Sequence, residues 1–364
     1  MAPMLPSEQI QHRALDASRA DLYWFSMTTT GTDSAAPLRV LLLGASGTIG
    51  RATARALVAR GHHVVSLIRP RPGVRSPTRD DALTQDLEGT EIRWADASDA
   101  ASLRHDGFAN EHFDAVISCL ASRTGIPADA WRIDYQANVE ALQAAKDAGV
   151  KQFIMLSAIC VQKPLLAFQQ AKLAFEKELI SSGLTYTIVR PTAFFKSLSG
   201  QLQRVKLGKS FLLFGDGQHT ACKPISDDDL GDFLAGCLEH ESRHNLILPI
   251  GGPGPAMTPR DQGDYLFKLL GKTPRFTSVP LWLLGAMGGT LGLLGKMFPA
   301  LADKAELARI GHYYASESML VWDAHAQRYD ADLTPSHGTQ TLFEAYDRWV
   351  RDEGVPDRGD HAVF

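Results

Sequence analysis

The 364-residue sequence has few cysteines and little net charge. Its four cysteines, Cys119, Cys160, Cys222 and Cys237, form neither a CxxC pair nor another metal-ligand spacing. They are also too few for a disulfide framework in a chain of this size. The net charge is -4, with lysine and arginine scattered, so no basic stripe favours a nucleic acid. We therefore expect no metal site, a reducing compartment and a small-molecule partner.

Long apolar runs are also scarce. Residues 1–36 lack the basic start and apolar run of a secretory signal, so we expect a disordered leader there and a tail at 355–364. The uncharged segment 279–295 contains one proline and five glycines, and it is shorter than the roughly 20 apolar residues that a membrane span needs. We favour a buried helix or pocket wall for it, with a membrane-surface contact as the alternative.

From Leu38 the sequence alternates short apolar runs with segments of helical length. The runs are apolar throughout, as in strands that are covered on both faces. This rhythm predicts an α/β fold with a Rossmann-type, doubly wound parallel sheet. The predicted strands are LRVLLL (38–43), HVVSLI (63–68), EIRW (91–94), FDAVISCL (113–120), KQFIMLS (151–157) and LTYTIV (184–189), and the predicted helices span 48–60, 98–106, 130–148 and 166–182.

After Arg190 the alternation breaks, and glycine and proline accumulate at 214–217, 248–259 and 272–274. We therefore predict a cofactor-binding Rossmann domain over residues 37–195. We also predict a smaller C-terminal lobe, mostly substrate-binding, over residues 196–354. Some of its segments should return to the Rossmann core. The lobe would lie over the carboxyl ends of the strands, where open α/β sheets bind ligands.

The stretch GASGTIG, residues 44–50, follows the first predicted strand and opens the first helix. Gly44, Gly47 and Gly50 have the spacing of a dinucleotide-binding turn, in which the backbone approaches the pyrophosphate without a side chain between them. The predicted cofactor-binding residues of this turn are the three glycines with Ser46, Thr48 and Ile49. The competing interpretation is a merely tight turn.

Three further positions at strand ends bear on the cofactor. Arg69 and Arg71 follow the second strand, where a fold that selects NAD presents an acid to the ribose 2′-hydroxyl. A guanidinium suits a 2′-phosphate instead, which predicts NADPH; the alternative is a pair of solvated loop charges. Asp96, after the third strand, is a candidate acceptor for the adenine amino group or a helix N-cap. Ala121, after the fourth strand, lies beside the expected cofactor path.

The helix AFQQAKLAFEKEL, residues 167–179, holds Phe168 and Lys172 four apart on one face, and Ser157 ends the preceding strand. This pattern resembles the serine, tyrosine and lysine of short-chain reductases, in which the lysine binds the nicotinamide ribose and the tyrosine moves a proton. Phenylalanine has no proton to give. We take Lys172, Phe168 and Ser157 as the candidate catalytic residues, against the alternatives of a solvated lysine and a core phenylalanine.

The stretch RPTAFF, residues 190–195, ends the sixth strand. We predict that Pro191 and Thr192 meet the nicotinamide carboxamide and that Phe194 and Phe195 form an apolar wall for a flat substrate, with Lys196 a candidate partner for its carboxylate. Lys206 and Lys223 are further candidates for that carboxylate. The alternative is that this segment feeds the core and that the lysines are surface residues.

Several longer strings resemble the divinyl chlorophyllide 8-vinyl reductases, within the atypical short-chain dehydrogenase family. The likeness runs from about Leu38 to about Gly354. The strings are LSAICVQKPLLAFQQAK (156–172), RPTAFFKSLSGQ (190–201), ACKPIS (221–226), LPIGGPGPAMTP (248–259) and YYASESMLVWD (313–323).

The resemblance implies an NADPH-dependent reduction of the 8-vinyl group of divinyl chlorophyllide, or a close precursor, to ethyl in chlorophyll or bacteriochlorophyll synthesis. It carries the phosphate-binding glycines onto Gly44, Gly47 and Gly50 and the lysine onto Lys172. Phe168 is the expected residue in this family. The implied location is cytoplasmic and peripheral to photosynthetic membranes in a bacterium, or the chloroplast in a plant or alga. Two alternatives stay open: a non-catalytic NADPH-binding regulator and a reductase of the isoflavone or lignan type.

Overall fold

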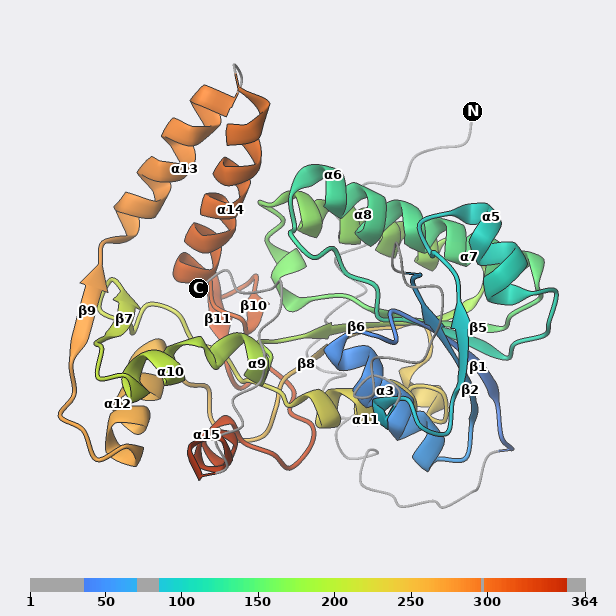
Figure 1. The fold of residues 1–364 in the computed structure, drawn as a ribbon, viewed down its shortest axis with the longest axis horizontal. Helices are drawn as coiled ribbons and strands as arrows, with labels where there is room; N and C mark the ends of the chain where they lie inside the picture. The colour runs from blue at the N-terminus through green and yellow to red at the C-terminus, as the bar shows by residue number, and fades with distance from the viewer. Residues whose placement is uncertain (1–35, 71–84, 296–297, 352–364) are drawn as a thin grey trace.

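A computed structural model describes residues 36–70, 85–295 and 298–351. The predicted leader, except its last residue, the tail and Arg71 lie outside the described residues. The body is a seven-stranded parallel sheet in the order β3-β2-β1-β4-β5-β6-β8 (Figure 1). Its strands are β1 (Arg39–Leu43), β2 (His63–Ile68), β3 (Glu91–Trp94), β4 (Ala115–Ser118), β5 (Gln152–Leu156), β6 (Thr185–Pro191) and β8 (Leu246–Ile250). The prediction of a doubly wound Rossmann-type sheet is confirmed.

Helices cover both faces of the sheet, as the apolar strands predict. In β1, Val40 and Leu42 face one core layer, whereas Leu41 and Leu43 face the other, and all four are fully buried. The first layer lies under α3 (Thr48–Ala59) and α11 (Asp227–Gly236), and the second lies under α7 (Asn138–Asp147) and α8 (Ala167–Ile180) (Figure 1). Burial of these two apolar layers supplies most of the driving force for folding.

The sheet extends one strand beyond the sequence prediction. Leu246–Ile250 lies in the region assigned to a glycine- and proline-rich break, yet it pairs in parallel with β6. Pro249 lacks an N–H, and the edge position of β8 tolerates that loss. Helix α11 also returns to the sheet, where Gly231 approaches the α3 backbone so closely that a Cβ there would lie 2.6 Å from the carbonyl carbon of Ala52.

Two predicted helices contain wider, π-helical turns. The segment predicted at 98–106 consists of α5 (Ala100–Ser102) and the π-helical Leu103–Phe108, and the segment predicted at 130–148 consists of α6 (Pro127–Ala130), the π-helical Trp131–Ala137 and α7. Such turns are rare and occur frequently at functional sites.

The residues after β6 build a second core beside the sheet. Ile159, Cys160 and Leu166, which precede β6, also belong to this core. The later members include Phe195, Leu202, Phe211, Leu266 and Tyr346. Its strands are β7 (Phe211–Phe214), β9 (Phe276–Val279), β10 (Val321–Asp323) and β11 (Arg328–Asp330), and its helices are α9 (Phe195–Leu198), α10 (Gly200–Lys206), α12 (Pro259–Leu269), α13 (Leu281–Gly295), α14 (Pro299–Ser316) and α15 (Leu342–Arg351). Short 3₁₀ turns span Ile159–Gln162 and Glu241–Arg243.

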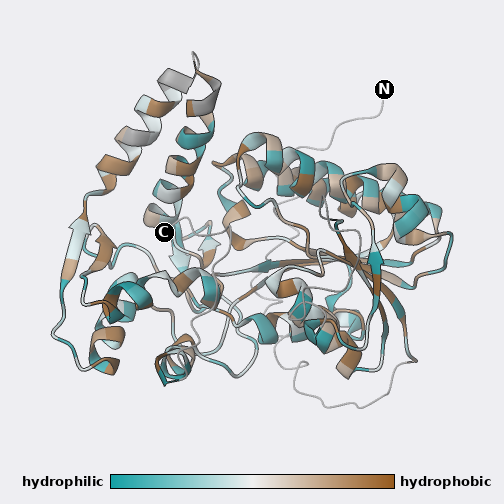
Figure 2. Ribbon diagram, in the orientation of Figure 1, coloured by the Kyte–Doolittle hydropathy of each residue, from teal (hydrophilic) through white to brown (hydrophobic). Residues whose placement is uncertain are grey.

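The uncharged segment 279–295 contains all of α13, which projects from the body alongside α14 (Figure 1). Figure 2 draws α13 in brown and pale tones without the teal of hydrophilic residues. The helix lines a pocket, as predicted, but it is not buried, because Trp282 is 69% and Leu283 is 40% exposed. Among the described residues, no helix is long and apolar enough to cross a membrane.

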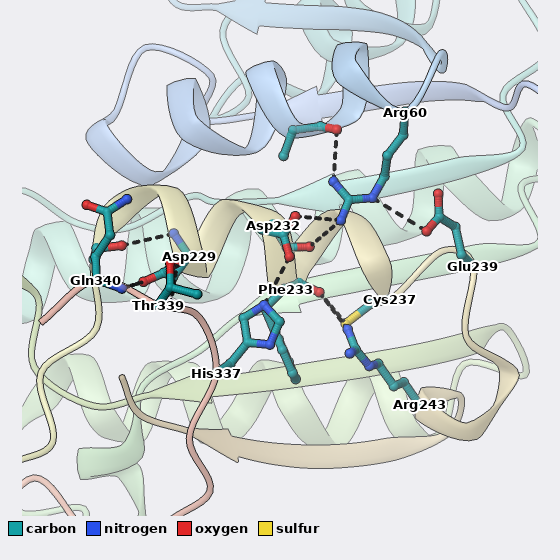
Figure 3. Close-up of polar contacts among 12 residues, drawn as sticks. Arg60, Asp229, Asp232, Phe233, Cys237, Glu239, Arg243, His337, Thr339 and Gln340 are labelled. Atoms are coloured by element: carbon teal, nitrogen blue, oxygen red, sulfur yellow. Dashed lines mark hydrogen bonds and ion pairs between the residues drawn. The ribbon is translucent and has the colours of Figure 1, made fainter. Parts of the chain in front are cut away.

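A polar network ties the C-terminal segment to the Rossmann helices (Figure 3). Arg60, at the end of α3, and His337 both contact the Asp232 carboxylate of α11, at 2.6 Å and 3.0 Å. The hydrogen bond with His337, supported by Arg60, holds the pKa of Asp232 well below its usual value. One turn earlier, Asp229 accepts hydrogen bonds from the backbone of Thr339 and Gln340. Residues 337–340, which lead into α15, are thus anchored on α11.

Candidate functional site

The glycine turn lies between the carboxyl ends of β1 and β4, where the strand order reverses. Gly44 has φ +73°, and a Cβ on it would lie 2.7 Å from the Cys119 carbonyl oxygen, so glycine is required there. A Cβ on Gly50 would lie 2.2 Å from the Gly44 carbonyl oxygen. Gly47 is the N-cap of α3 and provides no side-chain cap. The helix therefore begins with free N–H groups, the arrangement that binds a pyrophosphate.

The other residues of the turn differ in whether their side chains are accessible to a ligand. Ser46 is exposed and Thr48 is partly exposed at the first helical position, so both can reach a ligand. The Ile49 side chain is 8% exposed and belongs to the core, which leaves only its backbone for a cofactor.

Arg69 and Asp96, predicted separately, lie together at the ends of β2 and β3. Arg69 Nε is 3.3 Å from Asp96 Oδ1. Burial alone would raise the pKa of Asp96, but hydrogen bonds from Ser98 and the charge of Arg69 lower it below its usual value. The alternative role of Asp96 as a helix N-cap is wrong, because Asp99 caps α5 through the N–H groups of Ala101 and Ser102.

The loop after β4 passes beside the glycine turn. Ala121 is exposed there, whereas Cys119 is partly buried and its thiol lies 3.9 Å from the Thr53 hydroxyl. Burial raises the pKa of Cys119 to about 12, although the nearby Lys172 charge opposes that shift. The thiol is therefore neutral at physiological pH, and Lys172 must find its counter-charge elsewhere.

That counter-charge is Asp134, in the π-helical segment Trp131–Ala137. Lys172 Nζ lies 3.0 Å from Asp134 Oδ1, and the two side chains are only 6% and 1% exposed. The sequence did not indicate Asp134, because this residue lies 38 positions before Lys172 and no local spacing relates the two. The alternative of a solvated lysine is wrong, because Lys172 is buried.

Ser157 belongs to a second buried charge cluster. Its hydroxyl donates to Glu176 Oε1 at 2.5 Å, and the guanidinium of Arg190 binds both carboxylate oxygens of Glu176. Glu176 is 2% exposed and follows Lys172 by four residues on α8. That i,i+4 spacing could have predicted it. The hydroxyl proton of Ser157 is already engaged, and only its lone pairs remain for a ligand.

Phe168 stands in the first turn of α8, partly buried against the second core. A Cβ on the buried Gly125 would lie 3.5 Å from Phe168 Cδ1 and 3.1 Å from Ile310 Cδ1. The ring is thus enclosed between the loop after β4 and α14. Its surroundings are apolar, which suits contact with a hydrocarbon edge.

The residues after β6 are largely engaged within the protein. Thr192 donates its N–H to Ile250 and its hydroxyl to the carbonyl of Lys223. Phe195 is 4% exposed in the second core, which favours the interpretation that this segment feeds the core. Pro191 is buried at the end of β6, and Phe194 is partly buried against the α3 layer.

The three candidate lysines have different partners. Lys206 Nζ donates to the Trp349 carbonyl at 3.1 Å, and Lys223 Nζ donates to the Thr334 carbonyl at 3.0 Å. Both therefore tie the backbone together. Lys196 Nζ instead lies 3.1 Å from Thr48 Oγ1, at the start of α3.

Asp227 completes the electrostatics beside this helix start. Its Oδ1 is buried and has no hydrogen-bond partner among the residues that the structure describes. Burial, together with the neighbouring Asp228, raises the pKa of Asp227 to about 6, while Lys196, Arg55 and Arg51 oppose the shift. An anion bound at the start of α3 would therefore meet the cation of Lys196 beside a carboxyl group that is readily protonated.

A pocket of about 320 Å³ opens at the start of α8. It is lined by Leu165 and Leu166, by the α13 face that carries Gly285 and Gly288, and by Arg309 and His312 of α14. The lining is mostly apolar, with two basic side chains on one wall. Leu166 is only two residues from Phe168, so this pocket adjoins the candidate catalytic helix.

Comparison with known proteins identifies relatives over most of the chain. The family model described as NAD(P)H-binding matches residues 44–241. The chloroplastic divinyl chlorophyllide a 8-vinyl-reductase of Oryza sativa subsp. indica is 48% identical over 332 residues, covering 89% of this chain and 82% of that protein. The photosystem II assembly factor Ycf39 of Synechocystis is 25% identical over 69% of this chain and 73% of its own length.

Among solved structures, the leucoanthocyanidin reductase–NADPH complex of Vitis vinifera aligns with a TM-score of 0.61 at 18% identity. The alignment covers 86% of this chain and 99% of that one. At that identity the likeness concerns the fold. The match to the rice reductase, together with the NAD(P)H-binding model, shows that this chain belongs to the divinyl chlorophyllide a 8-vinyl-reductase family of NAD(P)H-binding oxidoreductases.

Proposed function

We propose that this protein reduces the 8-vinyl group of divinyl chlorophyllide, or of a close precursor, to ethyl, with NADPH as the hydride donor. The observation that carries the proposal is the pairing of a buried Lys172 with Phe168 on one helix face beside a dinucleotide turn. That arrangement retains the lysine associated with cofactor binding but has no phenolic acid. It suits a substrate without a carbonyl oxygen.

The preference for NADPH rests on Arg69. Its guanidinium lies at the end of β2, 3.3 Å from the carboxylate of Asp96, where the adenosine ribose is expected. A 2′-phosphate would accept charge-assisted hydrogen bonds from Arg69, whereas the bare hydroxyl of NADH offers no negative charge. Asp96 would then orient the guanidinium, either in addition to or in place of accepting a hydrogen bond from the adenine amino group.

The chemistry follows from the substrate. Bound NADPH supplies a hydride, which adds to the outer vinyl carbon. The charge left on the inner carbon spreads into the conjugated macrocycle, so an oxyanion-stabilising acid is unnecessary. Lys172 holds the nicotinamide ribose, Phe168 presents an apolar edge to the pigment, and Ser157 supports α8 through Glu176. The protein thus acts chiefly through orientation, and a proton from ordered water or from an acidic group near Lys172 completes the ethyl group.

We assign the pigment to the face bounded by α13, α14 and the start of α8. The pocket there is mostly apolar. On its wall, the guanidinium of Arg309 pairs with Glu306 through Nη1, at 3.1 Å, and its further N–H donors suit a propionate carboxylate. This replaces Lys206 and Lys223 as candidates, because both already bind backbone carbonyls. An Arg309→Gln variant should raise KM for the free acid and leave KM for the pigment methyl ester unchanged. Equal effects on both pigments would remove Arg309 from carboxylate binding.

The same face offers a contact with a lipid bilayer. Trp282 and Leu283 are exposed on α13, which has no charged residue, and tryptophan favours the membrane interface. In a bacterium this contact would hold the enzyme at the cytoplasmic side of photosynthetic membranes; in a plant or alga it would act inside the chloroplast. Trp282→Ser should reduce flotation with vesicles, whereas Leu207→Ser, at a similarly exposed site, should not. Equal loss in both variants would contradict the contact.

The reductase test is spectroscopic. The purified protein, mixed with NADPH and divinyl chlorophyllide, should shift the Soret band to the blue, since one conjugated vinyl group is lost. NADH should support the reaction poorly. Tight NADPH binding without any Soret shift would instead favour a non-catalytic NADPH-binding regulator, the rival function.

A further inference from the structure

Lys172 is a buried cation, and a buried charge is stable only when it is paired and hydrogen-bonded. Its Nζ is 3.0 Å from Asp134 Oδ1, and both side chains are almost completely enclosed. In reductases that use tyrosine, the lysine charge acts on the phenol. Here Phe168 occupies that position, and a carboxylate from another element balances the lysine.

Asp134 has a second set of contacts. Both of its carboxylate oxygens accept the backbone N–H of Ser122, at 3.3 Å and 3.4 Å. Ser122 lies in the loop after β4, the loop that runs along the expected cofactor path. One carboxylate therefore joins the Lys172 ammonium to the cofactor-side loop.

The backbone that carries Asp134 is itself fixed. Asn138 donates from Nδ2 to the carbonyls of Ile133 and Asp134, at 3.1 Å and 3.2 Å. Its Oδ1 accepts from the hydroxyl of Ser118, at the end of β4, at 2.6 Å. These hydrogen bonds hold the π-helical turn to the sheet. They thereby fix the direction in which the Asp134 carboxylate points.

We propose that Asp134 is a positioning residue of the reduction: it fixes the Lys172 ammonium in the direction of the nicotinamide ribose and locks the loop after β4 beside it. The inference rests on the proposed NADPH-dependent function. It also changes how a lysine variant is interpreted. Lys172→Met would leave Asp134 buried and unpaired, so a loss of activity in that variant combines lost cofactor binding with lost stability.

The test measures binding separately from catalysis. NADPH affinity is measured by nicotinamide fluorescence, and 2′,5′-ADP, which lacks the nicotinamide riboside, is measured by calorimetry. Asp134→Asn should weaken NADPH about tenfold or more, the factor that one lost charge-assisted hydrogen bond is worth. Its affinity for 2′,5′-ADP should stay within about twofold of the wild type, because the adenosine half is bound elsewhere.

Asp129→Asn is the matched control. Asp129 accepts hydrogen bonds from the backbone N–H groups of Arg123 and Thr124 in the same loop, at 3.0 Å and 3.2 Å, and it forms an ion pair with Arg132. It should leave NADPH affinity unchanged. The double variant Lys172→Met/Asp134→Asn removes both buried charges, so it should fold better than Lys172→Met and bind NADPH no more weakly.

Three results would contradict the inference. Wild-type NADPH affinity and turnover in Asp134→Asn would remove Asp134 from the site, and equal weakening of NADPH and 2′,5′-ADP would reduce it to a structural residue. Independent, additive effects of the two substitutions would also contradict the pairing. If the wild type binds NADPH but never reduces the pigment, the proposed function fails while the binding test of Asp134 still stands.

Discussion

Replacing Asp227 with asparagine should stabilise the protein without cofactor at neutral pH. The pKa of this carboxyl rises from 3.8 to about 6 on folding, first because of burial and then because of Asp228. A shift of about two units corresponds to about 3 kcal/mol. Partial solvent access and the favourable field of the α11 N-terminus reduce the expected gain to about 1–2 kcal/mol.

The sign of the pH dependence follows from the direction of this shift. Because the pKa is higher in the folded state, the contribution of Asp227 to wild-type stability falls as pH rises from about 4 to about 6, and its full cost persists above pH 6. Asp227→Asn lacks this cost. The difference between the two proteins should therefore be largest at pH 8, smaller at pH 5 and absent below pH 4.

Urea denaturation at several pH values measures the effect. Asp264→Asn is the control, since its carboxylate forms an exposed ion pair with Arg260, at 3.1 Å, that should be worth less than 1 kcal/mol and does not act on Asp227. A destabilised Asp227→Asn at pH 8 would refute the reasoning. A gain that does not change with pH would show that something other than titration is responsible.

The remaining predictions concern the candidate site. Ser157→Ala should lower the free energy of unfolding by about 1.5–3 kcal/mol in urea denaturation, because it removes a hydrogen bond to the buried Glu176 carboxylate. It should change kcat less than tenfold, and a large fall in kcat at normal stability would restore a catalytic role for Ser157. Phe168→Tyr should leave vinyl reduction within about tenfold of the wild type, and a large gain in kcat would show that a phenolic acid is needed. Lys196→Met should raise the Kd for NADPH about tenfold through loss of a phosphate contact beside Thr48. An effect confined to the KM of the pigment would instead support a role of Lys196 in substrate binding.

Much of the fold was predictable because the central strands β1, β4 and β5 are apolar and buried almost throughout, and because segments of helical length follow them. β8 was missed for an equally physical reason. Its LILPI stretch contains a proline and runs directly into glycines, which usually end a strand, and only the edge position makes it acceptable. The exposure of α13 was also missed, since an uncharged helix normally predicts burial.

The candidate site residues could be predicted where their positions depend on local sequence patterns. The glycine turn is confirmed as a strand-to-helix turn, and Lys172 is buried at the expected place on α8. Asp134 could not be found, because its pairing with Lys172 depends on how two helices pack rather than on spacing. Glu176 was within reach, since it lies one turn beyond Lys172 on the same helix.

The most direct test of the account is the fate of a labelled hydride. NADPH that carries deuterium in the transferable C4 position is mixed with the protein and divinyl chlorophyllide, and the product is analysed by NMR and mass spectrometry. The account predicts one deuterium in the methyl carbon of the new 8-ethyl group, because hydride adds to the outer vinyl carbon. Deuterium on the ring-attached carbon, or an ethyl product without deuterium, would contradict it.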